Sequence, residues 1–295
     1  MNISFEYYRI FYYVAKYENI TKAAMVLKSS QPNVTRIIHL LEDQLDCRLF
    51  LREPRGLKLT EEGKRLYAHV AIACQHLLDA EAELCWNKNI CSGTIELGVT
   101  ETALHLFLLK HLHGFQQKYS DIKIRIQNNT TPGILKALIN GRLDLAIVTT
   151  PFELNDTFAC EDLMTFREVP AGGSEYRALA GHPMSLKEFR FHSIIGLGYG
   201  TASYEYYRKV FMEQKLDYEP AMEVATADLV IPLLQNNLGV GFIPEPLAAP
   251  FFEDQSLVPL SLNVPLPSRD VKMLWDKSLS QSRAAATFCD YLRSL

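Results

Sequence analysis

The stretch Ser30-Gln31-Pro32-Asn33-Val34-Thr35-Arg36-Ile37-Ile38-His39-Leu40-Leu41 decides the fold of the first part of this 295-residue chain. At 100° per residue, its apolar side chains fall on one side of a helix that runs on to about residue 45: Val34, Ile37, Ile38, Leu41 and Leu45. The opposite side carries amide, hydroxyl, guanidinium and imidazole groups: Gln31, Pro32, Thr35, Arg36 and His39. These groups suit base edges and phosphates in a DNA major groove, although one polar helix alone is by default an ordinary solvated face.

Two shorter helical patterns precede this helix. Apolar residues recur at helical spacing over 7–15, and a second helix begins at Asn19-Ile20-Thr21, with Asn19 or Thr21 as its N-cap. Lys28-Ser29-Ser30 ends the second helix, and Ser30 caps the third. Residues 1–58 show no strand pattern, so the sequence predicts an all-α helix-turn-helix head.

A long helical pattern follows from residue 60 to about residue 87. Its apolar positions are spaced 4, 3, 4, 3, 4 as in a coiled-coil seam: Leu66, Val70, Ala73, Leu77, Ala80 and Leu84. A helix of roughly 40 Å is too long for a sixty-residue head to cover, so we expect the seam to meet a second chain as a homodimer. The alternative is a helix packed on its own domain, because two alanines weaken the seam.

Strands and helices alternate from Gly93 onward. A first set occupies 94–99, 104–118, 122–127, 132–140 and 144–148, and a second set occupies 193–196, 203–214, 222–225, 228–237 and 239–243. Two successive βαβαβ units predict two α/β lobes with mainly parallel sheets, and a strand at 271–275 and a helix at 282–292 complete one of them. Ligands in such lobes bind beyond the carboxyl ends of the strands.

The charge is distributed unevenly along the chain. The net charge of −4 excludes a polycation, yet residues 1–65 hold 11 Lys and Arg against 8 Asp and Glu, and the remainder holds 19 against 26. No apolar run is long enough to span a membrane, and the N-terminus has no secretion signal. Six cysteines without CxxC or Cys/His spacing indicate reduced thiols, so we expect a cytoplasmic protein with no metal or other cofactor.

Specific residues add a family resemblance over about sixty ungapped positions. These are Phe11-x-x-Val14-Ala15, Asn19-Ile20-Thr21-x-Ala23-Ala24-x-x-Leu27, Ser30-Gln31-Pro32-Asn33-Val34-Thr35-Arg36-x-Ile38, Leu41-Glu42-x-x-Leu45, Leu49-Phe50-x-Arg52 and Leu59-Thr60-x-x-Gly63. They resemble the winged helix-turn-helix head of the LysR-type transcriptional regulators. Gly141-Arg142-Leu143-Asp144-Leu145-Ala146 and Gly239-Val240-Gly241-Phe242-Ile243-Pro244 extend the likeness over nearly the whole chain. Asp46 departs from the pattern, because the family usually ends this helix with glycine; aspartate tolerates the left-handed conformation at modest cost.

The resemblance implies an architecture and its boundaries. It gives a winged helix-turn-helix domain at 1–59, a dimerising linker helix at 60–91, and a two-lobed α/β effector domain like that of periplasmic binding proteins. Lobe I is expected at 92–162 and 266–295, and lobe II at 163–265. A homotetramer is suggested by the resemblance alone.

The resemblance also assigns residues that contact double-stranded DNA. Those expected in the major groove are Gln31, Pro32, Asn33, Thr35 and Arg36, with His39 on the same outward side. Arg52 and Arg55, around the Pro54 and Gly56 turn, would form a wing that touches phosphate or the minor groove.

Polar residues that follow the predicted strands form the candidate effector pocket. They are Thr100, Glu101, Thr102, Thr131, Thr149, Tyr199 and Thr201, with Thr131 as a helix N-cap and Tyr199 as a lid. Capping alone explains a single threonine, but convergence from both lobes favours a small-molecule site. Helix N-termini favour an anion, whereas Glu101 opposes one unless it only caps.

Two other functions are consistent with two α/β lobes: an enzyme, or a solute-binding module, each with a helical head that does not bind DNA. The chain has no GxSxG, HExxH or P-loop motif, and the glycines at 196–200 do not form a dinucleotide fingerprint. A DNA-binding regulator controlled by a small molecule is therefore the preferred interpretation.

Overall fold

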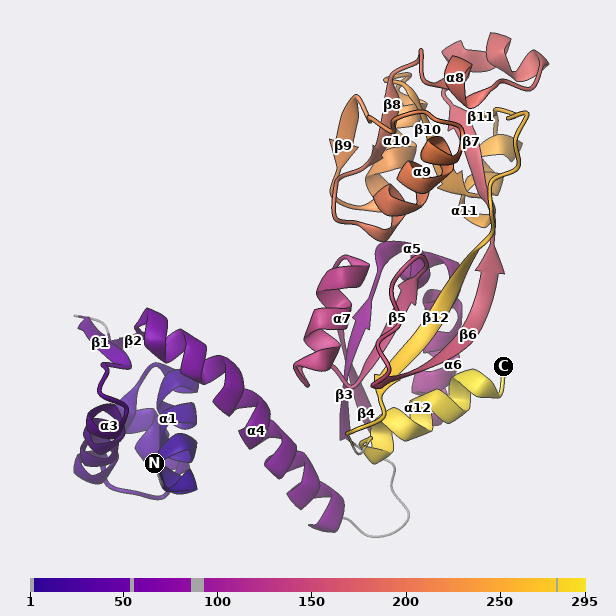
Figure 1. The fold of residues 1–295 in the computed structure, drawn as a ribbon. Coiled ribbons are helices and arrows are strands. Elements are labelled where there is room, and N and C mark those ends of the chain that lie inside the picture. Colours follow the sequence, from indigo (N-terminus) through magenta and orange to yellow (C-terminus); the bar gives the residue numbers. More distant parts are fainter. Residues whose placement is uncertain (1–2, 54–55, 86–92, 280) are drawn as a thin grey trace. The chain divides into compact units, whose positions relative to one another are not determined.

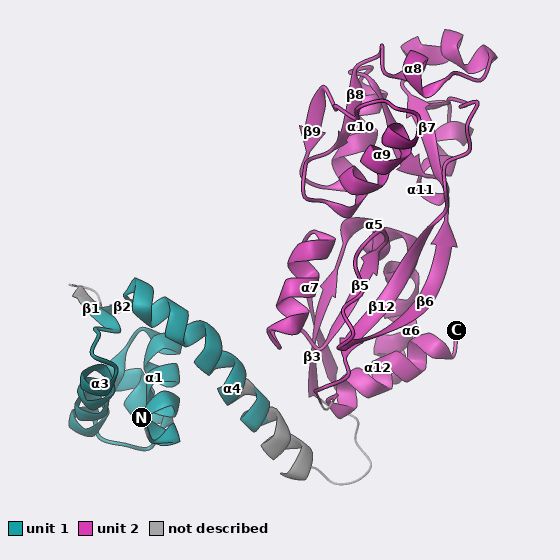
Figure 2. Cartoon of the chain, in the orientation of Figure 1, with its two compact units in different colours: residues 1–88 teal, residues 89–295 magenta. Residues whose placement is uncertain are grey.

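The computed structural model describes residues 3–53, 56–85, 93–279 and 281–295. The chain divides into two compact units, residues 1–88 and residues 89–295 (Figure 2). Figure 1 labels the helices and strands of both units along the chain. Each unit is described by itself.

Three helices build the head of unit 1: α1 (Phe5–Tyr17), α2 (Ile20–Val26) and α3 (Gln31–Leu45). Asn19, one of the two expected caps, accepts a hydrogen bond from the Lys22 N–H at 2.9 Å, and Ser30 caps α3 as predicted. The apolar side of α3 is buried against α1 and α2, with Phe11, Val34 and Leu41 fully inside. The tri-helical arrangement predicted from spacing is confirmed.

The expectation of a head without strands, drawn from spacing alone, is wrong, whereas the wing implied by the family resemblance is confirmed. β1 (Phe50–Glu53) and β2 (Gly56–Leu59) pair as an antiparallel hairpin, with Phe50 opposite Leu59. Each strand has four residues, too few for a period-two pattern to stand out. The head is therefore a helix-turn-helix with a two-stranded wing.

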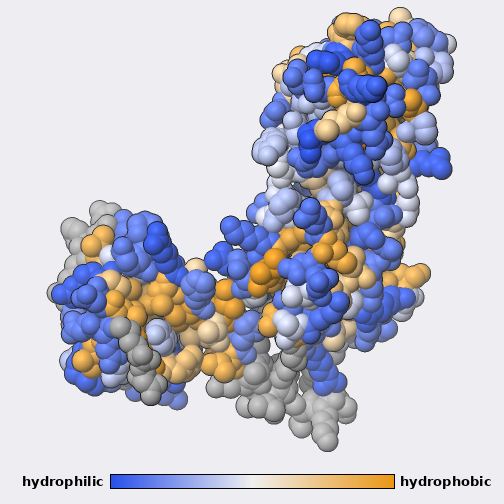
Figure 3. Space-filling view, viewed as in Figure 1, coloured by the Kyte–Doolittle hydropathy of each residue, from blue (hydrophilic) through white to orange (hydrophobic). Residues whose placement is uncertain are grey.

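Helix α4 (Glu61–Cys85) leaves the head, and its seam divides into two parts. Leu66 and Val70 pack into the core of unit 1, so this first part follows the alternative in which the helix covers its own domain. Ala73 and Leu77 are exposed, and apolar side chains gather along α4 in Figure 3. The side chains of Ala80 and Leu84 lie outside the described residues.

Lobe I of unit 2 is built on a five-stranded sheet in the order β4-β3-β5-β12-β6. The strands are β3 (Gly93–Val99), β4 (Ile122–Asn128), β5 (Leu145–Thr149), β6 (Phe158–Phe166) and β12 (Arg269–Asp276). A helical run of α5 (Glu101–Ala103), a π-turn (Leu104–Leu108) and α6 (Leu109–Lys118) packs on one face with α12 (Arg283–Arg293). Helix α7 (Thr131–Ile139) packs on the other.

Lobe II repeats this plan with the order β11-β7-β10-β8-β9. Its strands are β7 (Glu168–Gly172), β8 (Ile194–Leu197), β9 (Met222–Val224), β10 (Val240–Pro244) and β11 (Val258–Pro259). Its helices are α8 (Leu186–Phe189), α9 (Ala202–Glu213), α10 (Val230–Gln235) and α11 (Glu245–Glu253), with 3-10 turns at Ser174–Gly181 and Ala227–Leu229. The predicted parallel strands are confirmed in both lobes, but each sheet also contains one strand that is antiparallel to both of its neighbours, β12 in lobe I and β7 in lobe II.

The chain crosses between the lobes at two places. It leaves lobe I between β6 and β7 and returns where β12 begins (Figure 1). Because β6 stays in the sheet of lobe I up to Phe166, the first crossing is at Arg167, not after residue 162 as expected. The second crossing precedes Arg269, three residues beyond the expected boundary at 266.

Candidate DNA-reading surface and ligand pocket

The outward face of α3 brings together most of the residues predicted to contact DNA. A shallow groove runs along it, lined by Gln31, Pro32, Thr35, Arg36 and His39, with Leu40 and Asp43 at its far end. Gln31, Arg36 and His39 are exposed, as reading of base edges requires.

Asn33 lies beside this groove and positions its arginine. The Arg36 Nη2 donates to Asn33 Oδ1 at 3.1 Å, while the Asn33 amide donates to Ser29 Oγ at 3.1 Å. Asn33 therefore holds Arg36 from the start of the helix. Of the two wing arginines, Arg52 is part of β1 but its side chain is not described, and Arg55 lies outside the described residues.

Glu42 fixes α3 to the wing, and sequence reasoning missed this role. Only 4% of Glu42 is exposed, and its carboxylate accepts from Leu49 N–H at 2.8 Å, Phe50 N–H at 3.2 Å and Arg48 Nη1 at 2.7 Å. The sequence did contain a sign of this role: Glu42 lies on the apolar side of α3, where a carboxylate without a partner would be costly to bury. Asp46 then ends the helix at φ 51°, so the left-handed turn expected without glycine is confirmed.

A cavity of about 380 Å³ lies between the lobes of unit 2, large enough for a small metabolite. All but one of the predicted pocket residues line it: Thr100, Glu101, Thr102, Thr131, Thr149 and Thr201. Asn128, Asn129, Ser203 and Thr226 add further polar groups. Among the described residues that line it, Glu101 carries the one formal charge.

The threonine hydroxyls around this cavity have different partners. Thr130, not Thr131 as predicted, caps α7, while Thr131 Oγ1 donates to the Thr149 carbonyl at 3.3 Å. Thr201 caps α9 by accepting from the Tyr204 N–H at 3.1 Å. Thr100 Oγ1 is buried and has no hydrogen-bond partner among the described residues. Such a group favours a ligand that supplies its missing partner.

Tyr199 differs from the expectation, whereas Glu101 lines the cavity as predicted. Tyr199 is 80% exposed and does not line the cavity; its ring packs edge-on against Tyr204, with centroids 5.6 Å apart. Glu101 is at the rim and accepts a hydrogen bond from Asn128, while its other oxygen lies 2.6 Å from Nε2 of His105. Glu101 is therefore already engaged on both oxygens.

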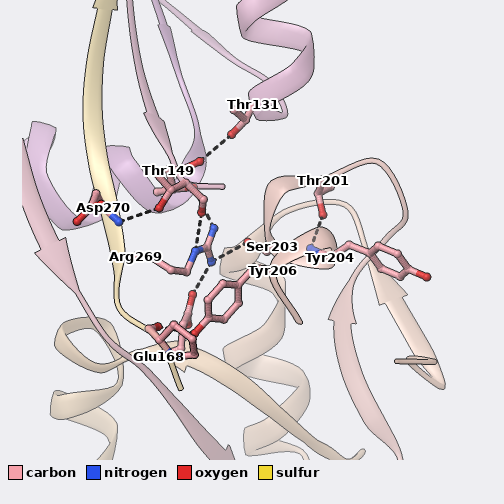
Figure 4. A network of polar contacts seen from close by, with 11 residues as sticks. Thr131, Thr149, Glu168, Thr201, Ser203, Tyr204, Tyr206, Arg269 and Asp270 are labelled. Carbon is pink, nitrogen blue, oxygen red and sulfur yellow. Dashed lines mark hydrogen bonds and ion pairs between the residues drawn. The ribbon is translucent and has the colours of Figure 1, made fainter. Parts of the chain in front are cut away.

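A buried ion pair that the sequence did not reveal joins the two crossings between the lobes. Arg269 Nη1 lies 2.6 Å from Glu168 Oε1, and both side chains are 1% exposed. The Arg269 guanidinium also donates to Thr149 Oγ1, the Thr150 carbonyl and Ser203 Oγ, as Figure 4 shows. Since Arg269 is in a polar stretch 101 residues from Glu168, no spacing pattern could have paired them.

The Arg269–Glu168 pair connects the cavity with the two places where the chain crosses between the lobes. Thr149 belongs to lobe I and Ser203 to lobe II, and both line the cavity. Arg269 does not line the cavity, but its guanidinium donates a hydrogen bond to the hydroxyl of each of these two residues. Burial raises the pKa of Glu168 above its ordinary value, even though the adjacent Arg269 guanidinium and Tyr207 hydroxyl act to lower it. A ligand that moves Thr149 or Ser203 therefore changes the hydrogen bonds of Arg269, which contacts both lobes.

The described residues contain neither a candidate metal cluster nor a helix that could span a membrane. No three His, Cys, Asp or Glu side chains come close enough together there to hold a metal ion. None of the helices that the structure describes is both long and apolar enough to cross a bilayer.

Comparison with known proteins covers both units. The model of the "LysR substrate binding domain" matches residues 91–295, and that of the "Bacterial regulatory helix-turn-helix protein, lysR family" matches residues 5–64. The chain is 25% identical over 289 residues to the HTH-type transcriptional regulator YofA of Bacillus velezensis, covering 97% of this chain and 96% of that protein. It is 26% identical over 295 residues to the Probable RuBisCO transcriptional regulator of Cyanidium caldarium, covering 93% and 88%.

A solved structure shares the fold. The probable transcriptional regulator PA0477 from Pseudomonas aeruginosa superposes with a TM-score of 0.70 at 19% identity, covering 99% of this chain and 97% of that chain. The helix-turn-helix head, the two α/β lobes and the two matching domain models lead to one conclusion: the chain belongs to the LysR family of transcriptional regulators.

Proposed function

We propose that the threonine-lined cavity binds the small-molecule effector of this regulator, and that the outward face of α3 reads its operator. This proposal rests on Thr100 Oγ1, a buried hydroxyl that has no hydrogen-bond partner among the described residues. It lies in a cavity where Arg269 donates to the lining residue Thr149. A ligand atom that pairs with Thr100 removes the cost of an unsatisfied group.

Effector binding can change DNA binding if the effector has different affinities for different arrangements of the two lobes. A ligand changes transcription only if it binds one arrangement of the lobes more tightly than another. Arg269 contacts residues of both lobes, so its hydrogen bonds differ between arrangements that separate Thr149 from Ser203. The effector would favour the arrangement in which this network is complete.

Self-association is proposed through the exposed part of α4. Ala73 and Leu77 leave an apolar seam uncovered by unit 1, and a second copy of the helix is the partner with a matching seam. We propose a homodimer through this helix and, from the family resemblance, a homotetramer of two such dimers. We place the protein in the cytoplasm, where its DNA is, and assign it no enzymatic role.

A thermal-shift screen of the full-length protein against central metabolites tests the cavity. An effector should raise the melting temperature by an amount set by its concentration relative to Kd. The double variant Thr100→Val, Thr149→Val should lose this shift, whereas Thr165→Val, an exposed threonine of β6 that does not line the cavity, should keep it. A double variant that responds like the wild type would refute the assignment.

A further inference from the structure

A second cavity of about 390 Å³ lies beside the first and shares five lining residues with it: Glu101, Thr102, Leu197, Ser203 and Ala227. Its remaining wall is largely apolar and comes from α9, α10, β10 and α11. The residues with the largest apolar side chains are Tyr207, Ile231, Phe242, Leu247 and Phe251. We call this space the aromatic compartment; it suits a ring-sized apolar group.

The charged groups of the aromatic compartment have one sign. Glu101, Glu168 and Asp228 line it, and no Lys or Arg occurs among its described lining residues. Its one basic group is His105, which is already engaged by Glu101 at 2.6 Å. Arg269 forms an ion pair with Glu168, but Arg269 is not among the residues that line the compartment. An anion would therefore be repelled here, and a cation attracted.

Glu168 lines this compartment, and one of its carboxylate oxygens can accept a further hydrogen bond. Its Oε1 is occupied by Arg269, while Oε2 is buried and has no partner at hydrogen-bond geometry in the described chain, although the Tyr207 hydroxyl is close enough to act on the pKa of Glu168. A buried carboxylate oxygen gains most from a charged donor, because charge-assisted hydrogen bonds are stronger than neutral ones. Burial also raises the pKa of Glu168, and a cation placed beside it would offset that effect.

We propose that the aromatic compartment binds an organic cation, namely a protonated amine on an apolar, ring-sized skeleton. The ammonium donates to Glu168 Oε2, and the skeleton packs among Tyr207, Phe242 and Phe251, whose ring faces also attract positive charge. Any regulatory effect rests on the effector role proposed above, whereas the binding itself does not.

Calorimetry on the full-length protein with 2-phenylethylamine tests the charge. Matched probes of equal size are neutral 2-phenylethanol and anionic phenylacetate. The amine should bind with a Kd about ten-fold or more below those of both other probes, because it alone brings a charged donor to Oε2. Equal or tighter binding of the alcohol or the acid would overturn the proposal.

Variants test the location. Glu168→Gln should weaken amine binding about ten-fold or more, but it also removes the partner of Arg269 and can unfold the protein. Ile231→Trp fills the compartment without touching the ion pair and should abolish amine binding at an unchanged melting temperature. Thr131→Val, which changes only the threonine-lined cavity, should leave amine binding unchanged.

The two proposals fail separately. Wild-type amine affinity in Ile231→Trp, or loss of amine affinity in Thr131→Val, would place the amine outside the aromatic compartment and overturn this inference alone. An unchanged metabolite response in the variant Thr100→Val, Thr149→Val would overturn the effector cavity and leave amine binding untouched.

Discussion

Glu42 is a buried carboxylate whose hydrogen bonds hold helix α3 against β1 and the residues just before it. Burial alone would raise its pKa, but hydrogen bonds from the Leu49 N–H, the Arg48 guanidinium and the Phe50 N–H outweigh it, so the pKa is below its ordinary value. A depressed carboxylate pKa stabilises the fold above the unfolded-state pKa, and this contribution is lost as the pH falls through the folded-state pKa.

Glu42→Gln should lower the free energy of unfolding at pH 7 by about 1–3 kcal/mol, because the amide is uncharged and cannot accept at both oxygens. The difference from the wild type should shrink as the pH falls below the ordinary glutamate pKa of about 4.3 and through the lowered pKa of Glu42, because the wild-type carboxylate then also becomes neutral. Urea unfolding of the full-length protein across this pH range measures both effects. Glu61→Gln, an exposed carboxylate paired with Lys64, is the control and should change little. Equal stability of Glu42→Gln and the wild type at pH 7 would show that the hydrogen bonds of Glu42 do not stabilise the head.

Arg36 is the exposed guanidinium in the middle of the groove on α3, and Asn33 holds it in place. Arg36→Ala should cost on the order of 1–3 kcal/mol in operator binding and relax the preference for one base. Fluorescence anisotropy with the operator duplex and single-base variants measures both. Arg9→Ala, which removes an exposed charge from α1, should keep the base preference. Unchanged operator affinity of Arg36→Ala would remove this residue from the interface.

Single residues were predictable from sequence where they belong to a periodic pattern or directly follow a predicted strand. The outward face of α3 follows from 100° spacing, and the pocket threonines follow from their place after strands. Arg269 and Glu168 lie in no pattern, and their pairing depends on how two crossing segments meet. Tyr199 was misplaced because a residue in a loop can point either into a cavity or into solvent, and here it is exposed.

At the scale of elements, the exposed part of α4 carries the expectation of dimerisation. Leu77→Glu should weaken self-association, because it places a charge in the seam that two helices would bury. Sedimentation equilibrium should show at least a roughly ten-fold rise in the dimer dissociation constant. His76→Glu, at an exposed neighbouring position off the seam, serves as the control. An unchanged dissociation constant for Leu77→Glu would mean that the copies meet elsewhere.

Some helices and strands were easier to predict from the sequence than others. The parallel strands alternate with helices, and all were predicted; β3, β5, β8 and β10 are largely buried, apolar runs, whereas β4 and β9 are more exposed. β6 alternates poorly between buried and exposed positions, so its strand and the exact crossing to β7 were missed. The seam of α4 was right in its spacing, but spacing alone does not say that its first half packs on the chain's own head.

At the scale of the molecule, the Arg269–Glu168 pair ties the two lobes of unit 2 where the chain crosses between them. Arg269→Met should destabilise unit 2 by about 3–5 kcal/mol, because it leaves Glu168 charged and buried without its partner. The double variant Arg269→Met, Glu168→Met should recover a large part of that loss, since no buried charge remains. Denaturant unfolding of the full-length protein checks both variants. A double variant as unstable as Arg269→Met would show that charge burial is not the cause.

Reading of DNA by α3 is best examined by selection from a random duplex library with the full-length protein. The wild type should enrich a motif of two related half-sites, bound about a thousand-fold more tightly than random duplex and with affinity that falls steeply as salt rises. Arg36→Ala should enrich a motif that is degenerate at one position of each half-site. No enriched motif for the wild type, or the same motif and affinity for Arg36→Ala, would contradict the assignment.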